Sequence, residues 1–121
     1  MPPPDPLYKL GPIYIAEKYW DRLLALVQQK NNFQTTLHYH QYLHKHYPKE
    51  LLEMYLPALR QRGDQVNSRP EYAELAGTMK KIMADIPRGK VPIKDLAREL
   101  IAKYPKRPAY LDELNAVLRI P

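Results

Sequence analysis

The chain has 121 residues, with 19 Lys and Arg against 13 Asp and Glu and no cysteine. This length suits one ordinary domain, and the lack of cysteine excludes disulfides, thiolate metal sites and a cysteine nucleophile. The longest uninterrupted apolar run, residues 23–27, is far shorter than the roughly 20 residues that cross a bilayer, and the N-terminus lacks the order of a signal peptide. We therefore expect a soluble cytoplasmic protein with no membrane partner.

Prolines divide the chain, because proline donates no backbone hydrogen bond and disfavours helix in the residue before it. Five of the 13 prolines lie within residues 1–12, which predicts an extended, proline-rich N-terminal arm. The sequence pattern of residues 13–121 predicts a single all-α helical-repeat domain. Apolar residues recur there at helical spacing, and no segment alternates with a period of two.

The first half of this domain predicts three helices. The first runs from about residue 13 to residue 30, where Asn31 ends the pattern and Asn32 offers a cap for the next helix. The second ends before Pro48, and the third begins there, contains an internal proline and stops at Gly63. The second half predicts three more helices, which begin near Pro70, Pro92 and Pro108.

A short motif recurs in the two halves of the domain. The pattern Leu-x-x-x-Tyr-Pro-Lys occupies residues 43–49 and again residues 100–106. This recurrence predicts two three-helix units, about residues 13–63 and 69–119, that stack as a short α-solenoid or a compact six-helix bundle. The residues expected in the core are Trp20, Leu23, Leu37, Leu43, Leu52, Tyr55, Leu75, Ile82, Leu100 and Leu114.

The four histidines are the densest group of side chains capable of forming a site. His40 and His44 are four residues apart, the spacing that places two imidazoles on one helix face, where a transition metal is held. A stable site needs a third ligand, and no carboxylate lies within this helix. The alternative is that both histidines border the buried stripe without metal.

Basic residues gather in the second predicted unit and form a candidate nucleic-acid patch: Lys80, Lys81, Arg88, Lys90 and Lys94. Such a cluster holds phosphates without sequence specificity. Lysine and arginine also favour helix C-termini because of the helix dipole, and no recognition helix or ribonucleoprotein motif accompanies them. Glycine-rich phosphate loops and nucleophile elbows are absent too, so the sequence predicts neither an enzyme nor a cofactor.

Tyrosine is abundant, with ten residues against a single phenylalanine. A phenol buries its ring while its hydroxyl keeps a polar partner, which suits a wet interface between proteins. Five of the tyrosines lie off or at the edge of the predicted stripes, as a protein-facing surface requires: Tyr8, Tyr14, Tyr39, Tyr42 and Tyr110. Of these, Tyr39, Tyr42 and Tyr110 are the candidate protein contacts. Ordinary packing at the rim of short helices is the alternative.

Three stretches carry a family resemblance: Tyr-Pro-Lys-Glu-Leu-Leu-x-x-Tyr at residues 47–55, Tyr-Ala-Glu-Leu-Ala at residues 72–76, and Tyr-Pro-Lys-Arg-Pro-Ala-Tyr-Leu-Asp-Glu-Leu at residues 104–114. Residues 47–118 thus resemble the C-terminal, tetratricopeptide-like helical region of bacterial proteins that contain a SWIM-type zinc finger. The finger's cysteine ligands have no counterpart here, so neither its zinc nor its DNA-binding role follows. The resemblance implies the family's helical scaffold portion, either as part of a larger protein or standing alone.

These observations lead to one expectation and one alternative. We expect a noncatalytic helical-repeat scaffold or protein-protein interaction module, with a protein partner and no cofactor. The alternative is nonspecific nucleic-acid binding through the basic cluster of the second unit.

Overall fold

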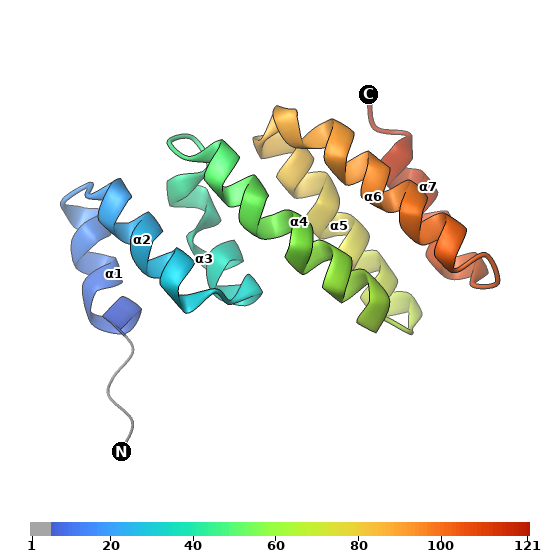
Figure 1. Cartoon of the computed structure of the whole chain (residues 1–121), viewed down its shortest axis with the longest axis horizontal. Coiled ribbons are helices and arrows are strands. Elements are labelled where there is room, and N and C mark those ends of the chain that lie inside the picture. Colours follow the sequence, from blue (N-terminus) through green and yellow to red (C-terminus); the bar gives the residue numbers. More distant parts are fainter. Residues whose placement is uncertain (1–5) are drawn as a thin grey trace, which may run out of the picture. The chain divides into compact units, whose positions relative to one another are not determined.

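The computed structural model describes residues 6–121. This range contains seven α-helices and one 3-10 turn and no strand (Figure 1), so the all-α prediction is confirmed. The chain divides into two compact units, residues 1–54 (unit 1) and residues 55–121 (unit 2). The division falls inside helix α4 (Pro48–Gln65) rather than in the polar linker predicted to separate the units.

Unit 1 begins with helix α1 (Pro6–Ala16), so the extended arm expected over residues 1–12 does not hold from Pro6 onward. Residues 1–5 lie outside the described residues. Pro6 occupies the first helical position, where a backbone N–H has no acceptor within the helix. Pro12 lies inside α1, and Gly11 before it has no Cβ to clash with the proline ring, which reduces the cost of helical backbone there.

The single helix predicted for about residues 13–30 is two helices, because α1 ends in a Schellman motif at Lys18. The Tyr19 N–H donates to the Tyr14 carbonyl (2.8 Å), and the Lys18 N–H donates to the Ile15 carbonyl (3.2 Å). Lys18 itself has a left-handed φ of 58°. This pair of bonds satisfies carbonyls at the helix end and turns the chain sharply.

Two adjacent asparagines end helix α2 (Trp20–Lys30) and begin helix α3 (Phe33–Leu43), as predicted. Asn31 adopts the left-handed conformation and donates its N–H to the carbonyl of Val27 (3.1 Å). Asn32 is the N-cap of α3, since its side-chain oxygen accepts from the Thr35 N–H (3.0 Å). Helix α2 packs against both α1 and α3.

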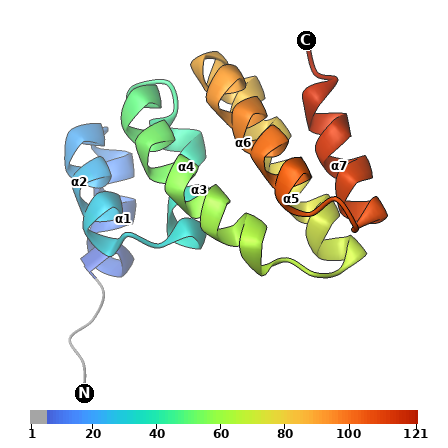
Figure 2. The same cartoon turned by 45° about the vertical axis from the view of Figure 1, so that its right-hand side comes forward.

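Unit 2 contains the rest of α4 and three helices that lie side by side in both views (Figure 1, Figure 2). The last of them packs against the other two. These elements are α5 (Arg69–Asp85), the 3-10 turn η1 (Pro87–Gly89), α6 (Lys90–Lys103) and α7 (Pro108–Leu118). The predicted starts at Pro70 and Pro108 agree with the structure, whereas α6 begins two residues before Pro92.

Tyr110 joins three helices of unit 2. Its side chain is fully buried, and its ring stacks on Tyr72 of α5 with centroids 4.3 Å apart and an interplanar angle of 8°. Its hydroxyl donates to the carbonyl of Gly63 in α4 (2.7 Å). Burial raises the pKa of this phenol, with smaller contributions from Tyr104 and Asp64. The hydroxyl therefore remains a neutral donor.

Gly63 was predicted to end its helix, but α4 continues through it to Gln65. The reason for glycine is close approach: a Cβ on Gly63 would lie 2.7 and 2.9 Å from the two terminal methyl groups of Leu100 and 3.3 Å from the Tyr110 hydroxyl. The missing side chain thus leaves room beside the backbone of α4 for the side chains of Leu100 from α6 and Tyr110 from α7.

The recurring Leu-Tyr-Pro motif has a shared beginning and two different continuations. The Tyr47 N–H donates to the Leu43 carbonyl (2.8 Å), and the Tyr104 N–H donates to the Leu100 carbonyl (2.9 Å). Afterwards α4 begins at once at Pro48, whereas α7 begins only at Pro108. The motif is therefore a common helix ending, and the repeat of whole units stays a prediction.

The core is close to the predicted one. All of the residues expected in the core are buried except Trp20 and Leu37, which are half-buried. Both lie on unit 1, Trp20 at the start of α2 and Leu37 within α3.

Lys18→Gly is expected to stabilise the protein by about 1 kcal/mol, because a left-handed backbone costs roughly that much for a residue with a Cβ. The measurement is urea unfolding followed by circular dichroism. Lys18→Ala is the control, since it removes the same charged side chain and keeps the Cβ. Equal stability of the two variants would contradict the prediction.

Gly63→Ala is expected to destabilise the protein by about 1–3 kcal/mol, because its methyl group would overpack the buried side chains of Leu100 and Tyr110. Gly77→Ala is the matched control in α5, where a Cβ would meet nothing within 4 Å. That change should stabilise by about 0.5–1 kcal/mol through helix propensity. Urea unfolding of both variants checks the opposite signs, and a common sign would refute the account of Gly63.

Candidate interaction surfaces

Helix α1 has an apolar solvent side. The sequence predicted an extended arm over this stretch and therefore no such helix face. Five exposed residues make up what we call the α1 outer face: Tyr8, Lys9, Pro12, Ile13 and Ala16. Tyr8 is 81% exposed and Ile13 is 53% exposed. Positions 8, 12 and 16 follow one stripe of the helix, with position 13 beside it. Apart from Lys9, this face offers water only apolar side chains and one phenol.

A shallow groove of about 340 Å³ adjoins this face, between α1 and α3. We call it the α1–α3 groove, and its lining residues are Leu7, Tyr8, Gln34, Thr35, His38 and Tyr39. Tyr8 belongs to both surfaces, so the groove continues the α1 outer face. The ring of Tyr39 lies edge-on to His38, with centroids 4.8 Å apart. A Cβ on Gly11 would lie 2.7 Å from the Tyr39 hydroxyl, so this glycine makes room for that ring.

The three tyrosines predicted as protein contacts have three different positions. Tyr39 lines the groove. Tyr42 is half-buried and stacks with Trp20, with centroids 6.4 Å apart. The prediction is wrong for Tyr110, because that side chain is fully buried and bonded to the Gly63 carbonyl, so no partner can reach it.

Trp20, expected in the core, belongs to a stack of aromatic rings on unit 1. His46 lies nearly parallel to it with centroids 5.3 Å apart, and Tyr42 covers it at an interplanar angle of 15°. Close by in sequence, the guanidinium of Arg22 lies over the ring of Tyr19, 4.6 Å from its centroid. Trp20 is thus half-buried at the start of α2, with its ring packed against aromatic rings of unit 1 rather than inside the core.

The candidate metal ligands His40 and His44 face each other as stacked rings. Their centroids are 5.0 Å apart and their planes differ by 14°. His40 is buried, and the Nδ1 atom of His44 is buried without a hydrogen-bond partner. Parallel stacking does not direct two nitrogen lone pairs at one point, as chelation requires. Among residues 6–121, no three histidines or carboxylates come together as a metal-binding group.

The five basic residues predicted as a patch lie around the junction of α5, η1 and α6, and we keep the name basic patch for Lys80, Lys81, Arg88, Lys90 and Lys94. Two of them are already engaged. Lys81 pairs with Asp85 at 3.4 Å, and the ammonium of Lys94 donates to the carbonyl of Ile120 just after α7. No ion pair joins the other three to a carboxylate of the described chain.

Val91 stands within the basic patch and was not singled out in the sequence. It is 70% exposed, in the first turn of α6 between Lys90 and Lys94. Within the described part of unit 2 it is the only large apolar side chain that is exposed. The sequence signal for this residue is an apolar side chain with one lysine directly before it and another three residues after it.

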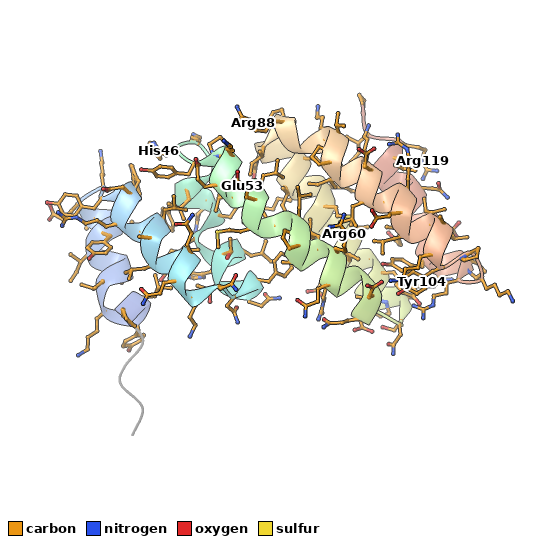
Figure 3. All side chains as sticks on the ribbon, viewed as in Figure 1. His46, Glu53, Arg60, Arg88, Tyr104 and Arg119 are labelled. Atoms are coloured by element: carbon orange, nitrogen blue, oxygen red, sulfur yellow. The ribbon has the colours of Figure 1, made fainter. Side chains whose placement is uncertain are left out.

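Figure 3 shows Arg88 and Tyr104 at opposite ends of unit 2. At the end that carries Tyr104, opposite charges are paired. Asp64 accepts hydrogen bonds from the Tyr104 hydroxyl (2.6 Å) and the Lys103 ammonium (2.9 Å). These two bonds lower the pKa of Asp64, and the same contact raises the pKa values of Tyr104 and Lys103. The guanidinium of Arg107 covers the Tyr104 ring and donates to the Val66 carbonyl (3.1 Å).

Comparison with known proteins gives no relative: no family model, no curated protein and no solved structure matches this chain. None of the helices in residues 6–121 has the length and apolar character that spanning a membrane requires.

Asp64 should make stability depend on pH in the acidic range. Its pKa lies below the ordinary value of 3.8 in the folded protein, so its contribution is present above that value and is lost as the pH falls through the folded pKa. We expect the difference in unfolding free energy between wild type and Asp64→Asn to shrink as the pH is lowered from about 6 to about 2. Urea unfolding across this range measures it, and a difference independent of pH would contradict the role of the carboxylate.

Proposed function

We propose that this chain is a noncatalytic helical module that binds protein, and that the α1 outer face with the adjoining α1–α3 groove receives an amphipathic helix of a partner. The observation that carries the proposal is the exposure of Tyr8 and Ile13 on a helix with almost no charged side chains on its solvent side.

An exposed apolar face of this kind has a physical cost. Each Å² of apolar surface that a partner covers is worth about 25 cal/mol, and a contiguous exposed patch is typical of an interaction site. The outermost helix of a helical array ordinarily turns a polar face to water. On α1 that face carries Tyr8, Pro12, Ile13 and Ala16 instead, which is the surface expected between two packed helices.

The spacing of these residues favours a helix as the occupant. Positions 8, 12 and 16 form a ridge four residues apart, the ridge type that interdigitates with the side chains of a second helix. The groove adds a channel with two tyrosines and the polar side chains of Gln34 and Thr35. Pro12 cannot donate to the Tyr8 carbonyl, so this acceptor lacks its helical donor at the edge of the groove.

The resemblance to the helical region of SWIM-type proteins supports the same kind of role. It suggests that the chain serves as a scaffold portion of a larger protein, for which helix-on-helix contacts are the ordinary mode of association. Nonspecific nucleic-acid binding through the basic patch is the second candidate function. It is favoured by the three cations of the patch that no carboxylate of residues 6–121 neutralises.

Ile13→Glu is expected to weaken helix binding at least tenfold, because burying an unpaired carboxylate against an apolar face is costly. The probe is a phage-displayed library of amphipathic helical peptides, selected on the wild-type protein and then measured by fluorescence anisotropy. Tyr8→Ser should weaken binding as well.

Ala25→Glu is the control for Ile13→Glu, since it places the same carboxylate at an exposed position on α2 of the same unit. Circular dichroism of all variants confirms that they keep their helices. Selected peptides that bind Ile13→Glu as tightly as wild type, or a selection that yields no helical peptide, would refute the proposed docking surface.

A further inference from the structure

The basic patch of unit 2 differs from an ordinary solvated charge cluster in its imbalance. Residues 55–121 carry 13 Lys and Arg against 8 Asp and Glu, so they hold a charge of +5 out of +6 for the whole chain. Within residues 80–95 five residues are basic and two, Asp85 and Asp95, are acidic. Asp85 pairs with Lys81 and Asp95 pairs with Arg98, so no ion pair with a carboxylate of the described chain neutralises Arg88 or Lys90.

The backbone adds to this potential. Helix α6 begins at Lys90 and has no acidic residue in its first turn, so the positive end of its dipole points into the patch. Pro92 occupies the third position of the helix and offers no N–H. A ligand at the start of α6 would therefore be bound mainly by lysine and arginine side chains. Charge complementarity favours an anionic ligand there.

Val91 narrows the choice among anionic occupants. Its side chain is 70% exposed and lies on the same helical turn as Lys94. A phosphate backbone makes no use of an exposed branched aliphatic group, and no exposed large aromatic side chain of the described unit 2 offers a base a stacking surface. An acidic protein segment uses both features, because its carboxylates meet the cations while an apolar side chain covers Val91.

We propose that the basic patch binds an acidic segment of a protein partner, in which an aliphatic side chain flanked by carboxylates packs on Val91. This proposal rests on the proposed function in treating the chain as a protein-binding module. It uses a surface separate from α1. The cations set the rate of encounter and the orientation, and the contact with Val91 sets the lifetime of the complex.

The test uses two fluorescein-labelled peptides and one labelled DNA duplex with the full-length chain. The first peptide is a short run of Glu and Asp with two central Leu residues, and the second has both Leu replaced by Ser. Anisotropy at about 0.15 M salt, where long-range attraction is largely screened, gives the three affinities. We expect the Leu peptide to bind several-fold more tightly than the Ser peptide and more tightly than the duplex.

Three variants assign the contacts. Lys90→Glu should lower the affinity for the Leu peptide about tenfold or more. Val91→Ser should lower the affinity for the Leu peptide several-fold and leave the affinity for the Ser peptide unchanged. The control is Lys106→Glu, which makes the same charge change at an exposed cation two residues after Tyr104 and should have little effect on binding.

The outcomes separate the alternatives. Tighter binding of the duplex than of either peptide would show a nucleic-acid surface and overturn the proposal. If Lys90→Glu and Lys106→Glu weaken binding of the Leu peptide equally, binding depends only on net charge and the proposed patch is refuted. If Val91→Ser does not change the affinity for the Leu peptide, the proposed apolar contact is refuted. Ile13→Glu should leave all three affinities unchanged, so failure here and failure of the α1 docking surface are distinguishable.

Discussion

The phenol of Tyr110 is the group on which the packing of unit 2 depends. A buried hydroxyl has to find an acceptor, and here the acceptor is the backbone carbonyl of Gly63 in α4, a residue without a side chain that would crowd the phenol. The same ring stacks on Tyr72, and the methyl groups of Leu100 fill the remaining space. Tyr110 of α7 thus contacts α5 through its ring and α4 through its hydroxyl, and the absent Cβ of Gly63 leaves room there for Leu100 of α6.

Unit 1 is held together differently, by helix ends that are closed locally. The Schellman motif at Lys18 ends α1, and Asn31 and Asn32 separate α2 from α3. In this unit Trp20 is half-buried within a stack of aromatic rings, and the solvent side of α1 is apolar. The apolar docking surface that we propose is thus a consequence of how the unit is built, since no described helix of the unit covers that side.

Charge is distributed unevenly along unit 2. At the end that carries Tyr104, Asp64 and Glu99 neutralise Lys103 and Arg60 across α4 and α6. Such exposed pairs contribute little to stability. At the end that carries Arg88, Lys81 and Lys94 are engaged, whereas Lys80, Arg88 and Lys90 form no ion pair with a carboxylate of the described chain and are available to a partner. Two surfaces of different chemistry follow, one apolar on unit 1 and one cationic on unit 2.

Local signals in the sequence determined the helical class, the asparagine caps, the helix start at Pro108 and the membership of most of the core. Each of these depends on neighbours within a few residues or on periodicity, which the chain carries by itself. Tertiary structure alone decided that Tyr110 is buried, that Gly63 continues a helix and that α1 exposes Tyr8 and Ile13. Those outcomes depend on atoms contributed from distant helices: a carbonyl 47 residues away in the case of Tyr110, and in the case of α1 the absence of any described helix over its outer face.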